Sequence, residues 1–124
     1  MKKNIIKEKS FSFSLQIISV YKNLIQEKEF ILSKQLLRSA TSIEANIEEA
    51  IAGSSGKDFK NKMSIALKEA RETNYWLNLL KDSDYINLIE FEALNNKCNE
   101  IIKILTSIII TTKERYFTNN KSIL

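Results

Sequence analysis

The chain has 124 residues and a mass of 14.3 kDa, which is the size of one ordinary domain. Hydrophobic residues make up 44% of it, and 19 Lys and Arg against 15 Asp and Glu leave a formal net charge of +4. The chain has no proline, two glycines, no histidine and one cysteine. Sheet proteins of this size need many turns rich in glycine and proline, so this composition favours a few long helices. The missing histidine and the lone cysteine exclude an internal disulfide and a cysteine-based zinc cluster, and they argue against most enzymes.

No segment has the features of a signal peptide or a membrane span. The basic N-terminus is not followed by an apolar stretch of signal-peptide length. The longest apolar-rich run, Ile101 to Ile110, is interrupted by Lys103 and Thr106. It is also shorter than the roughly 20 residues that a spanning helix needs. We therefore expect a cytoplasmic protein with no membrane partner.

The first predicted helix, over roughly residues 10–28, carries two apolar stripes instead of one. A helix in a monomeric bundle needs only one stripe, of about three positions per heptad. The second stripe therefore indicates a contact beyond the chain's own core. One stripe contains Phe13, Ile17, Val20 and Leu24, and the other contains Phe11, Ile18, Tyr21 and Ile25.

The second predicted helix, over roughly residues 33–52, has an apolar seam beside a row of polar residues. Ser33 is expected to cap its start, and Gly53 is expected to end it in a left-handed conformation. If the polar row meets the third helix, we expect Asn46 to hydrogen-bond Glu72 or Glu69 and fix the register. The alternative is that both polar rows face water. The predicted network consists of Ser42, Asn46, Glu49, Glu69 and Glu72.

The third predicted helix, over roughly residues 55–82, has an apolar seam sustained over about three heptads. Ser54 or Ser55 is expected to cap it, and the Asp82-Ser83-Asp84 segment is expected to close it. A short loop before it makes it antiparallel to the second helix. The Gly-rich loop at residues 53–58 lacks the spacing and the magnesium-binding hydroxyl of a phosphate loop.

The fourth predicted helix, over roughly residues 88–116, begins at Asn87 and Glu90, which have the spacing of a capping box. Cys98 lies in its seam and is expected to be a buried, inert thiol. The isoleucines of this helix spread over more than one face, which favours a subunit interface over the alternative of a wide core. The interface is assigned to Ile102, Ile104, Ile109 and Ile110.

The four segments together predict one all-α domain over residues 1–124, an antiparallel up-down-up-down four-helix bundle. We expect no catalytic residue, metal or cofactor. Glu69 and Glu72 have the spacing of a di-metal motif, but such a motif requires a histidine that the chain lacks. The net positive charge fits attraction to nucleic acid.

Long stretches of the chain carry a specific pattern. They are residues 32–43, 45–47, 49–50, 57–59, 65–73 and 75–77, with Lys9-Ser10-Phe11 and Phe13 in the first helix. In these stretches the chain resembles the four-helix-bundle family encoded in bacterial 23S rRNA intervening sequences. The resemblance implies a left-handed bundle that assembles into a ring, typically a pentamer. It also implies kinship with the accessory variability protein of diversity-generating retroelements, which binds nucleic acid and a reverse transcriptase.

We therefore expect a non-enzymatic, ring-forming protein whose basic surface binds RNA or a nucleoprotein through phosphate contacts. The alternative is a structural module that docks a protein, such as a reverse transcriptase, without touching nucleic acid. Five copies, each with a formal charge of +4, would carry +20 and bind with avidity. The candidate RNA contacts are Lys34, Arg38, Lys60, Lys68 and Arg71.

Overall fold

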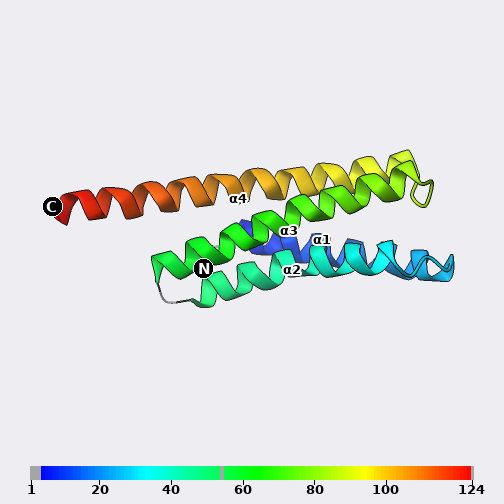
Figure 1. Cartoon of the computed structure of the whole chain (residues 1–124), viewed down its shortest axis with the longest axis horizontal. Coiled ribbons are helices and arrows are strands. Elements are labelled where there is room, and N and C mark those ends of the chain that lie inside the picture. The colour runs from blue at the N-terminus through cyan, green and yellow to red at the C-terminus, as the bar shows by residue number, and fades with distance from the viewer. Residues whose placement is uncertain (1–3, 54, 124) are drawn as a thin grey trace.

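The protein is described by a computed structural model for residues 4–53 and 55–123, with side chains as far as Arg115. Within those residues there are four α-helices and no strand, which confirms the all-α prediction (Figure 1). The helices are α1 (Ile5–Gln26), α2 (Leu32–Ala52), α3 (Gly56–Asp82) and α4 (Leu88–Ile123).

Each helix packs against the next one in the chain, and α4 returns to contact α1, as in a four-helix bundle. The α2–α3 contact is the most extensive of the four, and the α1–α4 contact is the least. With 36 residues, α4 extends well past the start of α1 (Figure 1). The ion pair between Lys9 and Glu100 places the start of α1 beside the middle of α4.

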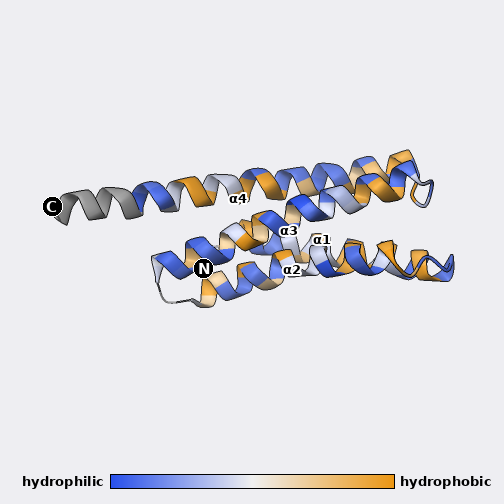
Figure 2. Cartoon of the chain, viewed as in Figure 1, coloured by the Kyte–Doolittle hydropathy of each residue, from blue (hydrophilic) through white to orange (hydrophobic). Residues whose placement is uncertain are grey.

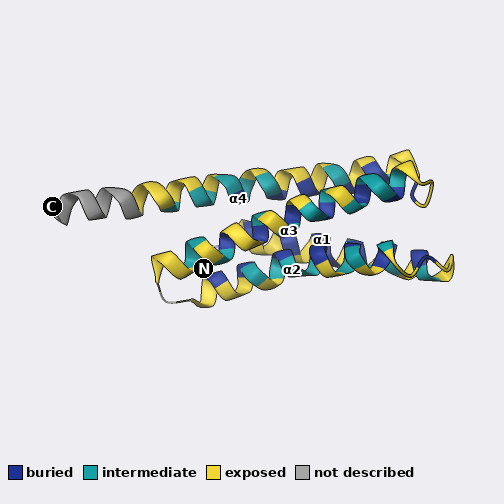
Figure 3. Cartoon of the chain, in the orientation of Figure 1, coloured by how far each residue is buried: buried dark blue, intermediate teal, exposed yellow. Residues whose placement is uncertain are grey.

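The predicted seams form the core, and Figures 2 and 3 show apolar, buried residues on the inward faces of the helices. The seam positions of α2 are all buried, and Phe59 is the one position of the α3 seam that is only half-buried. Between α2 and α3 the hydroxyl of Thr73 donates to that of Ser39 at 2.9 Å, so this core also holds a satisfied polar pair. The largest fully buried side chains are Phe13, Ile17, Leu24, Leu36, Ile43, Ile47, Met63, Leu77, Leu80, Ile101, Leu105 and Thr73.

The starts of the helices are partly as expected. The Ser55 side chain accepts the N–H of Asp58 at 3.0 Å, and the Asn87 side chain accepts the N–H of Glu90 at 2.8 Å, which confirms both caps. In contrast, α1 begins at Ile5, five residues earlier than predicted, because Asn4 caps it by accepting the N–H of Lys7 at 3.2 Å.

Ser33 does not cap α2, because the helix begins at Leu32 and Ser33 is buried within it. Glu29 caps the helix instead. Its carboxylate accepts the N–H groups of Ile31, Leu32 and Ser33 at 3.2, 2.9 and 2.6 Å. Partial burial raises the pKa of Glu29, but these three backbone bonds outweigh it and hold the pKa below its ordinary value.

The left-handed conformation predicted for Gly53 is wrong, since its φ of −70° is ordinary extended backbone. A Cβ at this position would lie 3.2 Å from the carbonyl oxygen of Glu49, so the tight exit from α2 still favours glycine. The left-handed residues are Lys28 and Asp84, each with φ of 66°. They close α1 and α3 with the same turn, in which the following N–H returns to a carbonyl at 2.9 Å.

Candidate functional site

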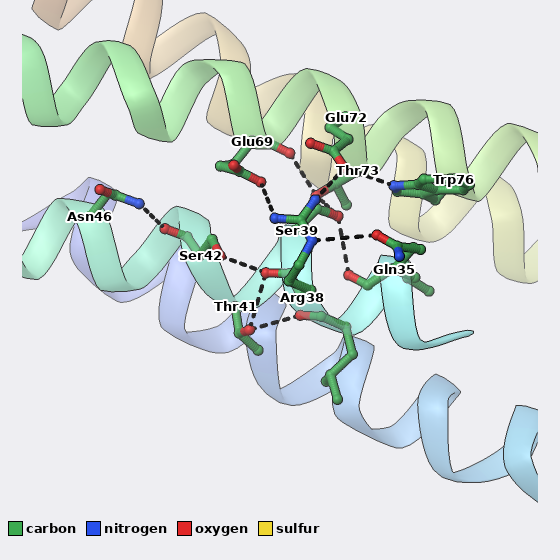
Figure 4. A network of polar contacts seen from close by, with 12 residues as sticks. Gln35, Arg38, Ser39, Thr41, Ser42, Asn46, Glu69, Glu72, Thr73 and Trp76 are labelled. Carbon is green, nitrogen blue, oxygen red and sulfur yellow. Dashed lines mark hydrogen bonds and ion pairs between the residues drawn. The ribbon is translucent and has the colours of Figure 1, made fainter. Parts of the chain in front are cut away.

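Arg38 is the centre of a polar cluster on the surface where α2 meets α3 (Figure 4). Its guanidinium donates to the carboxylate of Glu72 and lies 3.3 Å from that of Glu69. Its Nε also donates to Gln35 Oε1 at 3.4 Å. The indole Nε1 of Trp76 donates to the same carboxylate oxygen of Glu72 at 3.2 Å. One arginine from α2 thus bridges two acids and, through one of them, a tryptophan on α3.

The charges of this cluster stabilise each other. The hydrogen bond with Glu72 is the main cause that raises the pKa of Arg38 above its ordinary value. Partial burial raises the pKa of Glu72, but the bonds from Arg38 and Trp76 outweigh it and lower the pKa overall. The positive charge of Arg38 is therefore paired with the two acids of α3, although the side chain of Arg38 is 47% exposed.

Asn46 does not join this cluster, contrary to the prediction that it bonds Glu72 or Glu69. Its amide donates to the carbonyl of Ser42 on its own helix at 2.8 Å. The antiparallel register set by Ser39 and Thr73 places Glu72 level with Ala40 of α2. Arg38 is two residues from that level and Asn46 is six, so Arg38 is the side chain that meets Glu72.

The other predicted network residues of α2 form no hydrogen bond with Glu69 or Glu72 either. The Ser42 hydroxyl donates to the carbonyl of Arg38 at 2.6 Å, and Glu49 pairs with Lys62 at 3.4 Å on an exposed part of the α2–α3 surface. Of the five predicted residues, the structure joins Glu69 and Glu72 across the two helices through Arg38, which the sequence analysis had assigned to RNA binding. Asn46 and Ser42 are linked to each other and to Arg38 only through backbone carbonyls of α2 (Figure 4).

The candidate RNA contacts fall into two groups. Lys34 is exposed on α2, one turn before Arg38, whose charge is engaged by two acids. Lys60, Lys68 and Arg71 lie on α3. None of these three, nor Lys34, forms an ion pair within 4.0 Å among the side chains that the structure describes.

The α3 cations continue onto α4 across a cluster of amides. Asn74 of α3 donates to Asn95 and, at 3.3 Å, to Asn99 of α4. Arg71 lies three residues before Asn74, and the exposed Lys103 lies four residues after Asn99. Because the helices are antiparallel, both cations lie on the same side of the amide cluster. We call Lys57, Lys60, Lys68, Arg71 and Lys103 the basic stripe.

The acidic residues of this part of α3 face the other way. Glu69 and Glu72 are turned to α2, where Arg38 binds them. Asp58 lies one turn before Lys62, the residue that pairs with Glu49 of α2. The sequence alternates acids and bases along α3, but folding sorts the acids to the α2 side and leaves the basic stripe outside. Lys57 also helps to line a surface cavity of about 170 Å³ between α3 and α4.

The predicted interface isoleucines differ in exposure. Ile102, Ile104 and Ile109 are half-buried and pack against the core of their own chain. Ile110 is 52% exposed, and Phe11 and Leu15 on α1 are exposed to a similar degree. A large part of the surplus apolar surface predicted for α4 is thus used within the chain.

Cys98 is buried and its thiol donates to the carbonyl of Ala70 at 3.2 Å. Burial raises the pKa of this thiol to about 12, as predicted for an inert cysteine. Among the described residues, no group of three His, Cys, Asp or Glu side chains is arranged to hold a metal ion. No helix in the same part of the chain has the length and apolar character needed to cross a membrane.

Fold and surface together define an all-α bundle of four helices whose described residues include a basic stripe on α3 and α4. The chain belongs to the 23S rRNA-intervening sequence protein family, whose model matches residues 2–107. It is similar to a protein of unknown function from the S23 ribosomal protein family of Bacteroides thetaiotaomicron, known from a crystal structure at 1.70 Å resolution. The two are 52% identical over 84% of this chain and 97% of that one, with a TM-score of 0.83. No curated protein matches the sequence. The resemblance to this family inferred from the sequence is confirmed, and neither description names an enzymatic activity.

Proposed function

We propose that this protein is a non-enzymatic, homo-oligomeric bundle that binds RNA through the basic stripe. The observation that carries the proposal is the sorting of charge on α3, which leaves the five cations of the stripe without an ion pair within 4.0 Å among the described side chains. Lysine and arginine side chains in such an arrangement bind phosphates by displacing counterions. From Lys57 to Arg71 the stripe follows about 21 Å of helix, long enough to contact several successive phosphates.

The family description supports RNA as the polyanion, since it associates the protein with 23S rRNA. Lys34 and Arg38 contribute less in this proposal. Lys34 lies on α2, away from the stripe, and the charge of Arg38 is bound by Glu69 and Glu72. The alternative function, docking of a protein without RNA contact, predicts that the stripe is irrelevant to RNA.

The test is binding of a fluorescein-labelled 23S rRNA fragment, measured by anisotropy from low to moderate salt. Five phosphate contacts predict a log–log salt slope of about −3.5 for a single strand. The Lys60→Glu/Arg71→Glu variant is expected to bind at least about tenfold more weakly and with a shallower slope. Lys34→Glu, which changes charge on α2, is the matched control and should bind almost as the native protein does. Equal losses in the two variants, or no binding at about 50 mM salt, would refute the role of the stripe.

The oligomer belongs to the same proposal. Ile110 and the neighbouring half-buried Ile102, Ile104 and Ile109 form its proposed interface, with Phe11 and Leu15 of α1 as further exposed apolar surface. The resemblance favours five subunits in a ring. Light scattering at micromolar concentration is expected to give a multiple of the 14.3 kDa chain. Ile110→Glu should lower that mass, whereas Ile51→Glu, at an exposed position near the end of α2, should not.

A further inference from the structure

The two loops at one end of the bundle expose a concentration of large apolar side chains. The α1–α2 loop and the α3–α4 loop lie at this same end (Figure 1). Phe30 and Ile31 are 60% and 76% exposed, and Leu88 and Ile89 are 59% and 82% exposed. Nothing in the described chain covers them, and Figure 3 shows this end largely exposed. We call these four residues the apolar end.

A cavity of about 340 Å³ lies beside the apolar end, between the last turns of α1 and the α3–α4 loop. The residues that line it include the acids Glu27 and Glu90 and the amide residues Asn23, Gln26 and Asn87. The cavity is therefore rich in hydrogen-bond acceptors and carries two negative charges. This chemistry suits the head of a lysine or arginine side chain.

The surroundings of the cavity are acidic in a protein whose net charge is positive. Lys28 is the one basic residue in the loop segments 27–31 and 82–92. Nearby Lys81 is already held, with its ammonium 4.1 Å from the centre of the Phe91 ring and 3.7 Å from Asp82. RNA and anionic membranes are repelled by such an end, so the complementary ligand is cationic and partly apolar. The acids in these segments are Glu27, Glu29, Asp82, Asp84, Glu90 and Glu92.

We propose that this end of the bundle binds a basic amphipathic helix of a partner protein. The apolar face of that helix packs on Ile31 and Ile89, and one of its lysine or arginine side chains enters the cavity between Glu27 and Glu90. The surface is separate from the basic stripe and has the opposite charge. The inference therefore does not depend on RNA binding, and the protein would connect a protein at one surface to RNA at another.

The probe is a fluorescein-labelled 18-residue peptide of leucine and lysine at helical spacing, with a glutamate-for-lysine version as control. The lysine peptide is expected to bind the full chain, and the glutamate peptide is not. Two variants separate the contributions: Ile31→Ser/Ile89→Ser removes apolar contact, and Glu27→Gln/Glu90→Gln removes charge. Each should weaken binding at least tenfold, while Ile51→Ser/Ile65→Ser, at exposed positions on α2 and α3 outside the apolar end, should leave it unchanged. Helix content by circular dichroism checks that every variant is folded.

Three results would overturn the inference. The first is a native protein that does not bind the lysine peptide, and the second is a loss of binding in the Ile51→Ser/Ile65→Ser control as large as that in the two test variants. The third is a lower mass of Ile31→Ser/Ile89→Ser in light scattering, which would show that the apolar end joins copies of this chain. RNA binding measured on the same variants is expected to stay unchanged, so failure here and failure of the proposed RNA function are distinguishable.

Discussion

Removing the carboxylate of the buried Glu29 is expected to destabilise the protein through the loss of the cap of α2. Three backbone N–H groups of α2 lose a charged acceptor at 3.2, 2.9 and 2.6 Å, and the side chain is only 8% exposed. Loss of an N-cap costs about 1 kcal/mol and up to about 2 in buried cases. Glu29→Ala is therefore expected to lower the free energy of unfolding by about 2 kcal/mol, which shifts the Tm of a chain this size by roughly 8 °C.

The pH dependence follows from the direction of the pKa shift. Folding holds the pKa of Glu29 below its ordinary value of 4.5, so the unfolded chain binds its proton more readily. The stabilisation is fully present above that value and is lost as the pH falls through the lower, folded pKa. Glu29→Gln does not titrate, so its stability should approach that of the native protein as the pH falls from about 5 to about 3.

The assay is urea and thermal denaturation followed by far-UV circular dichroism at one protein concentration. Glu27→Ala is the matched control because Glu27 lies in the same loop and accepts no hydrogen bond from the described part of α2. The capping argument fails if Glu29→Ala is no less stable than Glu27→Ala. It also fails if the difference between Glu29→Gln and the native protein stays constant down to pH 3.

Three further predictions concern the turn, the ion cluster and the thiol. Lys28→Gly should raise the urea midpoint, with a gain of about 1 kcal/mol, because glycine adopts φ of 66° without a Cβ clash; a lower midpoint would contradict this. Arg38→Lys should cost about 1 kcal/mol, since an ammonium cannot bridge two acids as a guanidinium does. In a Glu72→Gln background it should cost less, and a double-mutant cycle with zero coupling would argue against the bridge. Cys98 should resist a thiol reagent at pH 8 until guanidinium unfolds the chain, because at a pKa of about 12 its thiolate is scarce; rapid labelling of the folded protein would be inconsistent with its burial.

The helical periodicity was sufficient to predict the core. Apolar residues at spacings of three and four had to lie on one face, and positions such as Leu36, Ile43 and Leu77 are fully buried in the structure. The missed starts of α1 and α2 have local causes. Asn4 caps α1 five residues before the predicted start, and Glu29 caps α2 from a position outside the usual cap.

The polar contacts between helices could not be predicted in the same way. Both Arg38 and Asn46 lie on the polar side of α2, and which of them meets Glu69 and Glu72 depends on how far α3 is shifted along α2. Periodicity gives the face of a helix but not this shift. Helical spacing along α3 would have been enough to predict that Lys57 belongs to the basic stripe. Lys103 is different, because only the pairing of α3 with α4 brings it to the stripe.

The contact between Trp76 and Glu72 has a practical consequence. Trp76 is the chain's single tryptophan. Its indole donates a hydrogen bond to Glu72, the α3 acid that also binds Arg38 of α2. Tryptophan emission, excited selectively against the four tyrosines, therefore reports from one known place. Its wavelength and intensity are expected to respond to any event that separates α2 from α3. Unlabelled protein is enough to follow such an event in real time.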